Sequence, residues 1–193
     1  MIFSHEKRYI FLRNPKTGSR SMQRTLIQTA HGANGRGPHM LPHMIVEQLG
    51  REAWDQYFKF VFVRHPWDHF VSLWCWFIKN KRVPPNESFI ELAFREPHFF
   101  FSPIFEPYLT LDGKPCVDFI GKLERIQEDY NEVCNLLSLN RVTVPNVLSN
   151  YGRDRDYRVY YNDNPELIAR VEYLYGGKEV IDYYGYKYGD KTW

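Results

Sequence analysis

The sequence is short of cysteine and has no long apolar run. Its three cysteines, Cys75, Cys116 and Cys134, form neither a paired framework nor a C-x-x-C motif, so we expect a protein of a reducing compartment. No stretch approaches the ~20 apolar residues of a membrane span, and the N-terminal segment MIFSHEKRYIFL lacks the apolar run of a signal peptide. We therefore expect a cytoplasmic protein that does not bind a membrane.

An excess of charge of one sign is also missing. The chain has 25 Lys and Arg residues and 23 Asp and Glu residues, which gives a formal net charge of +2. Nucleic-acid binders usually present a large basic face. The composition argues against that class, although a local cationic pocket for one small polyanion stays possible. At 193 residues, of which 44% are hydrophobic, the chain suits one domain spanning residues 1–193.

Strand and helix patterns alternate along the chain. Apolar runs at residues 9–13 and 57–64 predict buried strands, and helical spacing follows each of them, at residues 20–29 and from Pro66 onward. This alternation indicates an α/β fold, with a small central parallel sheet flanked by helices. The other predicted elements are helices at 43–50, 86–96, 125–139 and 163–177 and a hairpin around Asp112-Gly113 whose second strand ends at Lys122.

The first strand leads into a segment suited to an oxyanion. The sequence RNPKTGSRS, residues 13–21, precedes and opens a helix, and the first amides of a helix have no carbonyl partner within it. Gly18 lets the backbone approach a ligand closely, and Lys16 adds a mobile positive charge. Hydroxyl donors come from Thr17, Ser19 and Ser21. The alternative is a turn of small residues that caps the helix, with Lys16 in solvent.

The second strand ends in a similar way, at Arg64. Pro66 suits the first position of a helix, and a helix that begins there brings Ser72 into its second turn. Arg64 and Ser72 could then bind one phosphate group, the arginine through its planar fork of donors. The alternative is a structural Arg64 that pairs with Asp68, with Ser72 as a small packing residue.

Two such segments at one edge of a sheet indicate a ligand with two separated phosphate-like ends, because open α/β sheets bind ligands beyond the carboxyl ends of their strands. A P-loop kinase is the obvious competitor, but its loop reads G-x-x-x-x-G-K-[ST]. Here Lys16 precedes Gly18, and Arg64 stands where such enzymes carry the aspartate that holds Mg²⁺. We therefore expect direct binding of the anion without a metal ion.

Both segments resemble those of the sulfotransferase family. PKTGSRS (15–21) resembles the P-loop-like 5′-phosphosulfate loop, and FKFVFVRHPWDHFVSLW (58–74) resembles the strand and helix that hold the 3′-phosphate of 3′-phosphoadenosine-5′-phosphosulfate (PAPS). FIGKLERIQEDY (119–130) and the tail at 160–186 are similar to later family segments, in the same order. The closest resemblance is to the carbohydrate branch, with its uronosyl 2-O- and chondroitin-type enzymes, as a small soluble member of the bacterial or viral kind.

The resemblance implies an enzyme that moves a sulfuryl group from PAPS to an acceptor hydroxyl, with a carbohydrate as the expected acceptor and no required metal ion. Lys16 would contact the phosphosulfate bridge, and residues 17–21 would cradle its oxygens. Arg20 occupies a position at which the family usually has Thr or Ser. Arg64 and Ser72 would hold the 3′-phosphate. The implied donor-binding residues are Lys16, Thr17, Gly18, Ser19, Arg20, Ser21, Arg64 and Ser72.

A histidine is the expected catalytic base, because the ordinary pKa of imidazole is close to neutral pH. A segment of the family opens with histidine and closes with glycine eleven residues later, a spacing that His39 and Gly50 match. His39 is therefore the first candidate base and His43 the second. Lys16 would act on the leaving group. The alternative is a loop histidine without a role.

Two other classes of function stay open. A Mg-dependent P-loop-type kinase of small molecules or nucleotides would bind ATP together with Mg²⁺. A catalytically silent protein on the same scaffold would bind the desulfated nucleotide or a glycan without transferring sulfate. The segment 151–161 is interpreted as a solvated loop whose arginines and aspartates compensate each other; its arginines could alternatively close over the nucleotide or meet an anionic acceptor.

Overall fold

The computed structural model describes residues 1–29, 33–34, 39–95, 109–146 and 152–192. The chain forms two compact units. The first comprises Met1–Val63 and Pro107–Leu148, and the second comprises Arg64–Glu106 and Ser149–Trp193. The single domain suggested by the chain length stays a prediction. Within the described ranges, no helix has both the length and the apolar character that crossing a bilayer demands, and the cytoplasmic location also stays a prediction.

The first unit is built on a five-stranded sheet in the order β3-β1-β2-β4-β7. β2 pairs in parallel with β4, and β4 pairs in parallel with β7, so the predicted parallel sheet is confirmed for these three strands. The prediction of a parallel sheet is wrong for β1 and β3, because β1 runs antiparallel to both β2 and β3. Only residues 5–8 join β1 to β2, and so short a link cannot connect parallel strands. The strands are β1 (Ile2–Ser4), β2 (Tyr9–Leu12), β3 (Ala33–Asn34), β4 (Phe58–Val63) and β7 (Phe119–Lys122).

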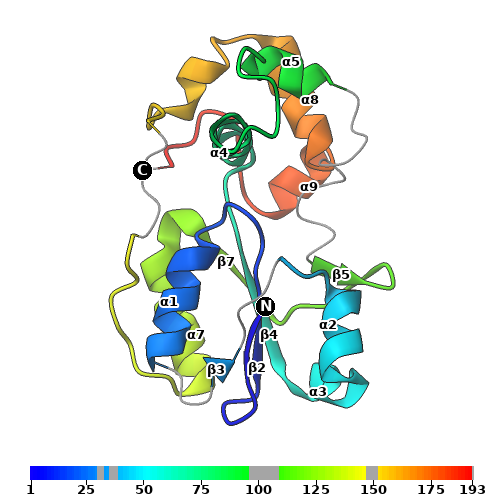
Figure 1. Ribbon diagram of the computed structural model, residues 1–193, viewed down its shortest axis with the longest axis vertical. Coiled ribbons are helices and arrows are strands. Elements are labelled where there is room, and N and C mark those ends of the chain that lie inside the picture. Colours follow the sequence, from blue (N-terminus) through cyan, green and yellow to red (C-terminus); the bar gives the residue numbers. More distant parts are fainter. Residues whose placement is uncertain (30–32, 35–38, 96–108, 147–151, 193) are drawn as a thin grey trace. The chain divides into compact units, whose positions relative to one another are not determined.

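Helices cover both faces of this sheet (Figure 1). They are α1 (Ser19–Thr29) and α7 (Ile126–Leu137) on one face, and α2 (Pro42–Leu49) and α3 (Arg51–Gln56) on the other. β4 is buried along nearly its whole length, as expected for a strand covered on both sides. On the face of α1 and α7, the rings of Phe11 and Phe60 stack with centroids 5.1 Å apart, in a core shared with Met22 and Tyr130.

The predicted hairpin is confirmed at its turn and wrong in its second strand. β5 (Thr110–Leu111) and β6 (Lys114–Pro115) pair antiparallel around Asp112 and Gly113, both of which have a positive φ. The strand that ends at Lys122 is a separate element, β7, which pairs with β4. A short 3₁₀ helix, η1 (Leu123–Arg125), connects β7 to α7.

α4 is the central helix of the second unit. Trp67 Nε1 donates a hydrogen bond to the carbonyl oxygen of Ile168 at 3.0 Å, which joins α4 to α8. The ring of Phe70 packs edge-on against that of Phe89, with centroids 5.2 Å apart, which joins α4 to α5. The elements are α4 (Pro66–Lys79), α5 (Phe89–Phe94), the 3₁₀ helix η2 (Tyr157–Tyr160), α8 (Pro165–Leu174) and α9 (Lys178–Tyr183).

His65, directly before α4, joins several segments of the second unit. It is 1% exposed, and its Nε2 donates to the carbonyl oxygen of Lys187 at 2.9 Å. Its ring contacts three aromatic rings at centroid distances from 4.7 to 5.5 Å, those of Trp67, Tyr157 and Tyr186.

Acid should weaken the second unit through His65. Burial lowers the pKa of His65, assisted by the Arg64 charge and opposed by the Lys187 hydrogen bond and by the Asp68 and Asp190 charges. The neutral ring is thus favoured in the folded chain, and this contribution to stability is complete above the unfolded-state pKa of about 6.5 and is lost as pH falls below it.

The measurement is urea unfolding of the parent chain and of His65→Phe between about pH 7.5 and about pH 5. The free energy of unfolding should fall less with acid in the variant, because phenylalanine keeps the ring contacts and cannot bind a proton. An equal fall in the free energy of unfolding of both proteins would show that His65 is not the cause of the acid sensitivity.

A second stability prediction concerns Gly121, which lies opposite Phe62 in the sheet. A Cβ atom at Gly121 would lie 2.6 Å from Cε1 of the Phe62 ring. Gly121→Ala should therefore lower the free energy of unfolding by about 1–3 kcal/mol through overpacking. Adding Phe62→Leu makes room for the new methyl group. In urea unfolding, the double variant should therefore lose less free energy of unfolding than the sum of the losses in the two single variants. Simple additivity would show that the clash is not the cause.

Candidate functional site

The predicted oxyanion segment forms a bent loop after β2. Asn14 is fully buried, and its Nδ2 donates to the carbonyl oxygen of Phe62 at 3.4 Å, which ties the loop to β4. Lys16 has a φ of +59° and Gly18 a φ of +76°, whereas Thr17 between them has no positive φ. The two positive φ values bend the chain tightly here, and main-chain amides of such turns can form a concavity that binds anions. A left-handed lysine is uncommon, although Lys81 in this chain has a positive φ as well.

Gly18 is required by its packing as well as by its φ. A Cβ atom at this position would lie 2.7 Å from Cδ1 of Leu123 and 2.9 Å from Cδ1 of Ile126. The Gly18 carbonyl oxygen accepts the amide of Met22 at 3.0 Å, which is the first hydrogen bond of α1. Glycine therefore lets the loop lie directly against η1 and α7 where the helix begins.

The hydroxyl groups of the loop have different roles. Thr17 is fully buried, and its Oγ1 donates to the Asn14 carbonyl oxygen at 3.0 Å, so this hydroxyl stabilises the loop itself. Ser19 and Ser21 lie in the first turn of α1 and are 6% and 9% exposed. Arg20 between them is exposed. The first-turn amides have no carbonyl partner within the helix, and the helix dipole favours an anion at this end.

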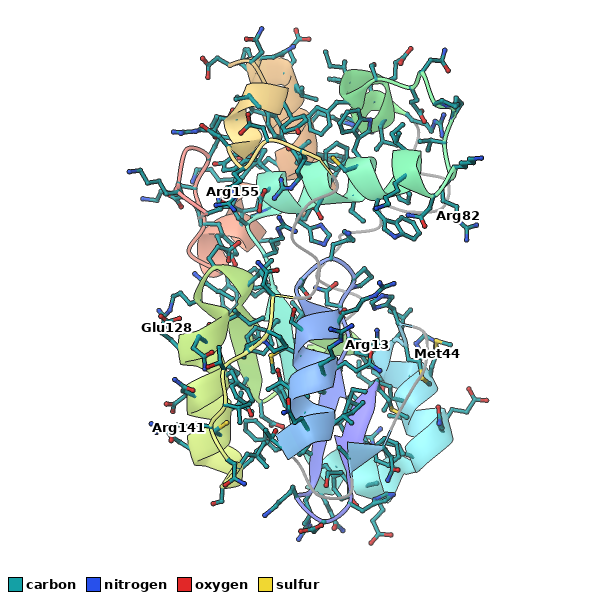
Figure 2. All side chains as sticks on the ribbon, turned by 60° about the vertical axis from the view of Figure 1, so that its left-hand side comes forward. Arg13, Met44, Arg82, Glu128, Arg141 and Arg155 are labelled. Atoms are coloured by element: carbon teal, nitrogen blue, oxygen red, sulfur yellow. The ribbon has the colours of Figure 1, made fainter. Side chains whose placement is uncertain are left out.

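His39 contacts the strand that leads into this loop. Its Nδ1 lies 2.6 Å from the carbonyl oxygen of Arg13, the residue that follows β2 (Figure 2). A carbonyl oxygen can only accept, so Nδ1 carries the proton. The lone pair of the neutral ring is then on Nε2, which is the nitrogen able to take a proton. His43 lies exposed on α2.

The surroundings of His39 keep its ring neutral. The residue is exposed, yet partial desolvation of the ring is the largest cause that lowers the pKa of His39. The charges of Arg13 and Arg20 lower the pKa further, and the hydrogen bond to the Arg13 carbonyl opposes them. A histidine with a lowered pKa is unprotonated at neutral pH, as a base must be.

In the second unit, Arg64 makes the ion pair that the structural alternative predicted. Its Nε donates to Oδ2 of Asp68 at 2.7 Å, and its Nη2 lies 2.6 Å from the same oxygen. Arg153 Nη1 donates to the other oxygen, Oδ1, at 2.6 Å. Asp68 is fully buried and Arg64 is 5% exposed. One carboxylate therefore serves two guanidinium groups.

Ser72 lies in the second turn of α4, as the sequence predicted, and is 4% exposed. The phosphate-binding role of Arg64 and Ser72 stays a prediction. The predicted residues are divided between the units: Lys16, Thr17, Gly18, Ser19, Arg20, Ser21, His39 and His43 belong to the first, and Arg64 and Ser72 to the second. In the described ranges, no group of three or more His, Cys, Asp or Glu side chains could hold a metal ion.

Two features were missed by sequence reasoning. The pairing of Arg153 with Asp68 joins residues 85 positions apart, and nothing periodic in the segment 151–161 indicates which of its arginines turns inward. The Arg13 carbonyl is a main-chain group, so no residue type could signal its bond to His39. The pairing of Arg64 with Asp68 did carry a signal, because the two residues lie four positions apart on either side of the helix start at Pro66.

Comparison with known proteins identifies the family. The model of the sulfotransferase family matches residues 1–98, about half of the chain. An uncharacterized protein of Archaeoglobus fulgidus is 31% identical over 121 residues, which cover 60% of this chain and 94% of that relative. No solved structure matches the chain. The matched residues contain both the loop after β2 and the segment from Arg64 to Ser72, and the chain belongs to the sulfotransferase family.

Proposed function

We propose that this protein transfers a sulfuryl group from PAPS to a hydroxyl group of a carbohydrate, with His39 as the base. Membership of the family supports sulfuryl transfer, and the family generally uses PAPS as the donor. One observation carries the assignment of the base, namely the 2.6 Å hydrogen bond from His39 Nδ1 to the Arg13 carbonyl oxygen. Because that bond fixes the proton on Nδ1, Nε2 is left to accept a proton from the acceptor.

The loop after β2 is suited to the phosphosulfate end of the donor. The left-handed Lys16 and Gly18 and the first-turn amides of α1 offer main-chain donors, and the Lys16 ammonium adds a positive charge. Such groups stabilise negative charge that develops on the sulfuryl oxygens and on the departing phosphate. In this proposal the Thr17 hydroxyl keeps the loop in shape, since it already donates to Asn14.

The reaction is an in-line displacement at sulfur. The acceptor oxygen forms a new bond to sulfur while the bond from sulfur to the phosphate oxygen breaks, and adenosine 3′,5′-bisphosphate leaves. The proton of the acceptor hydroxyl moves to His39 Nε2. Lys16 stabilises the departing phosphate, and positioning of the two substrates supplies much of the remaining rate enhancement.

Arg64 and Ser72 are proposed to bind the 3′-phosphate of the donor. Both are nearly buried, and the guanidinium fork of arginine matches the geometry of phosphate oxygens. The carbohydrate acceptor is inferred from the resemblance of residues 15–21 and 58–74 to the carbohydrate branch.

The proposal is tested by donor binding and sulfuryl transfer in three variants. Lys16→Gln removes the charge but keeps most of the side chain, so it should weaken binding of adenosine 3′,5′-bisphosphate and slow transfer. His39→Ala should leave nucleotide binding intact and lower turnover by about 10²- to 10⁴-fold, the usual contribution of a general base. His43→Ala is the matched control and should keep turnover. Calorimetry measures binding, and radiolabelled PAPS with a panel of glycans and other alcohols measures transfer.

Full turnover in His39→Ala would refute the base assignment. Nucleotide binding without transfer to any acceptor would favour the catalytically silent protein. Binding of ATP that requires Mg²⁺, without binding of the bisphosphate, would favour a kinase.

The pH dependence of the reaction gives a further prediction. Since the pKa of His39 is lowered, kcat/KM should rise with pH to a plateau, with a midpoint below the ordinary value of about 6.5. Arg20→Gln removes one of the charges that lower this pKa, so its midpoint should move to higher pH. The value of kcat/KM is measured at acceptor concentrations well below KM. If the midpoint in Arg20→Gln equals that of the parent chain, the Arg20 charge does not lower the pKa of His39.

A further inference from the structure

Exposed apolar side chains gather where α5 and α8 lie side by side in the second unit (Figure 1). Ile90 and Phe94 lie one helical turn apart on α5 and are 49% and 48% exposed. Tyr173 on α8 is 69% exposed. Single exposed apolar residues are ordinary on protein surfaces, whereas a group of them rimmed by polar residues is typical of a binding surface.

Arg170 on α8 contacts both aromatic rings of this surface. Its Cζ atom lies 5.4 Å from the centroid of the Tyr173 ring and 6.0 Å from that of the Phe94 ring, distances typical of cation–π contacts. Its Nε donates to the carbonyl oxygen of Ala93 at 2.9 Å. One hydrogen bond and two rings therefore hold the guanidinium in place before any ligand arrives, which lowers the entropy cost of binding.

The positive charge of Arg170 has no carboxylate partner among the residues that the structure describes. Glu166 lies four positions earlier on α8, a spacing at which opposite charges often pair, yet the two side chains make no ion pair within the described ranges. In the same ranges, the terminal nitrogens Nη1 and Nη2 donate no hydrogen bond. These two nitrogens can therefore bind two oxygens of an anion.

We propose that Phe94, Arg170 and Tyr173 form a binding site for a sulfated saccharide. In this site Nη1 and Nη2 of Arg170 donate to oxygens of a sulfate ester, and the two rings pack against the apolar C–H face of a sugar ring. The inference rests on the proposed function, since it gives the carbohydrate acceptor a contact in the second unit.

The reaction class favours this ligand over an uncharged one. Transfer of a sulfuryl group to a hydroxyl group creates a sulfate ester, so an acceptor chain that has already reacted carries an anion that Arg170 can bind. An uncharged saccharide would pack against the rings of Phe94 and Tyr173 and leave the arginine charge without a partner.

The test compares a sulfated chondroitin tetrasaccharide with the same tetrasaccharide after removal of its sulfate esters. Calorimetry at low ionic strength gives the two Kd values, because salt screens exposed charges. The parent chain should prefer the sulfated form. Arg170→Gln should reduce this preference by about 10-fold, the lower range for losing a charged hydrogen bond. Tyr173→Ala should weaken binding of both forms, because the ring contacts the sugar itself.

Two matched controls come from the same unit. Arg158 pairs with Asp156 at 2.7 Å on the surface, as the solvated-loop interpretation predicted, and Tyr183 on α9 is 78% exposed. Arg158→Gln and Tyr183→Ala should both keep the affinities of the parent chain. Arg170→Lys should recover part of the preference, because it restores the charge without the planar fork. Circular dichroism checks the fold of every variant.

An unchanged preference in folded Arg170→Gln would overturn the inference and leave the proposed function standing. Inorganic sulfate that binds the parent chain as tightly as the sulfated tetrasaccharide would also overturn it, since the rings would then contribute nothing. A dimer of the parent chain that Tyr173→Ala dissociates, measured by light scattering, would assign this surface to a second copy of the chain instead. An Arg170-dependent preference without transfer to any glycan would support this site and overturn the proposed function.

Discussion

The parallel pairing of β2 with β4 is the constraint on which the first unit depends. It sets Leu12 opposite Val61, so that both strands end at the same edge of the sheet, and helices on both faces exclude water from their apolar side chains (Figure 1). The buried amide of Asn14 then reaches from the exit of β2 to the Phe62 carbonyl of β4. The loop that contains Lys16 and Gly18 follows β2 at this edge. The Arg13 carbonyl, which accepts the hydrogen bond from His39, lies at the same end of β2.

Much of this arrangement could be predicted from the sequence. The apolar runs at 9–13 and 57–64 are strong signals because both strands are buried on both faces, and Pro66 and Gly50 mark helix ends by their own backbone chemistry. The antiparallel β1 was missed because it is only three residues long. The separation of β7 from the hairpin was missed because Cys116 to Asp118 interrupt the strand without a clear turn signal.

The candidate site was predictable only where the chemistry resides in side chains close together in the sequence. Lys16 to Ser21 and the pair Arg64 and Ser72 are local patterns. The tautomer of His39 depends on a main-chain oxygen 26 residues away, and the pairing of Asp68 with Arg153 depends on how a distant segment folds back. Information of this kind lies in tertiary structure, and the sequence pattern does not contain it.

The close packing behind Gly18 links the loop after β2 to apolar side chains of η1 and α7. Leu123 and Ile126 leave no space for a methyl group at Gly18, so two aliphatic side chains set part of the shape of this loop. In the proposed function the loop binds the donor, and the strength of that binding would then respond to the bulk of side chains in η1 and α7 while every polar group of the loop stays the same.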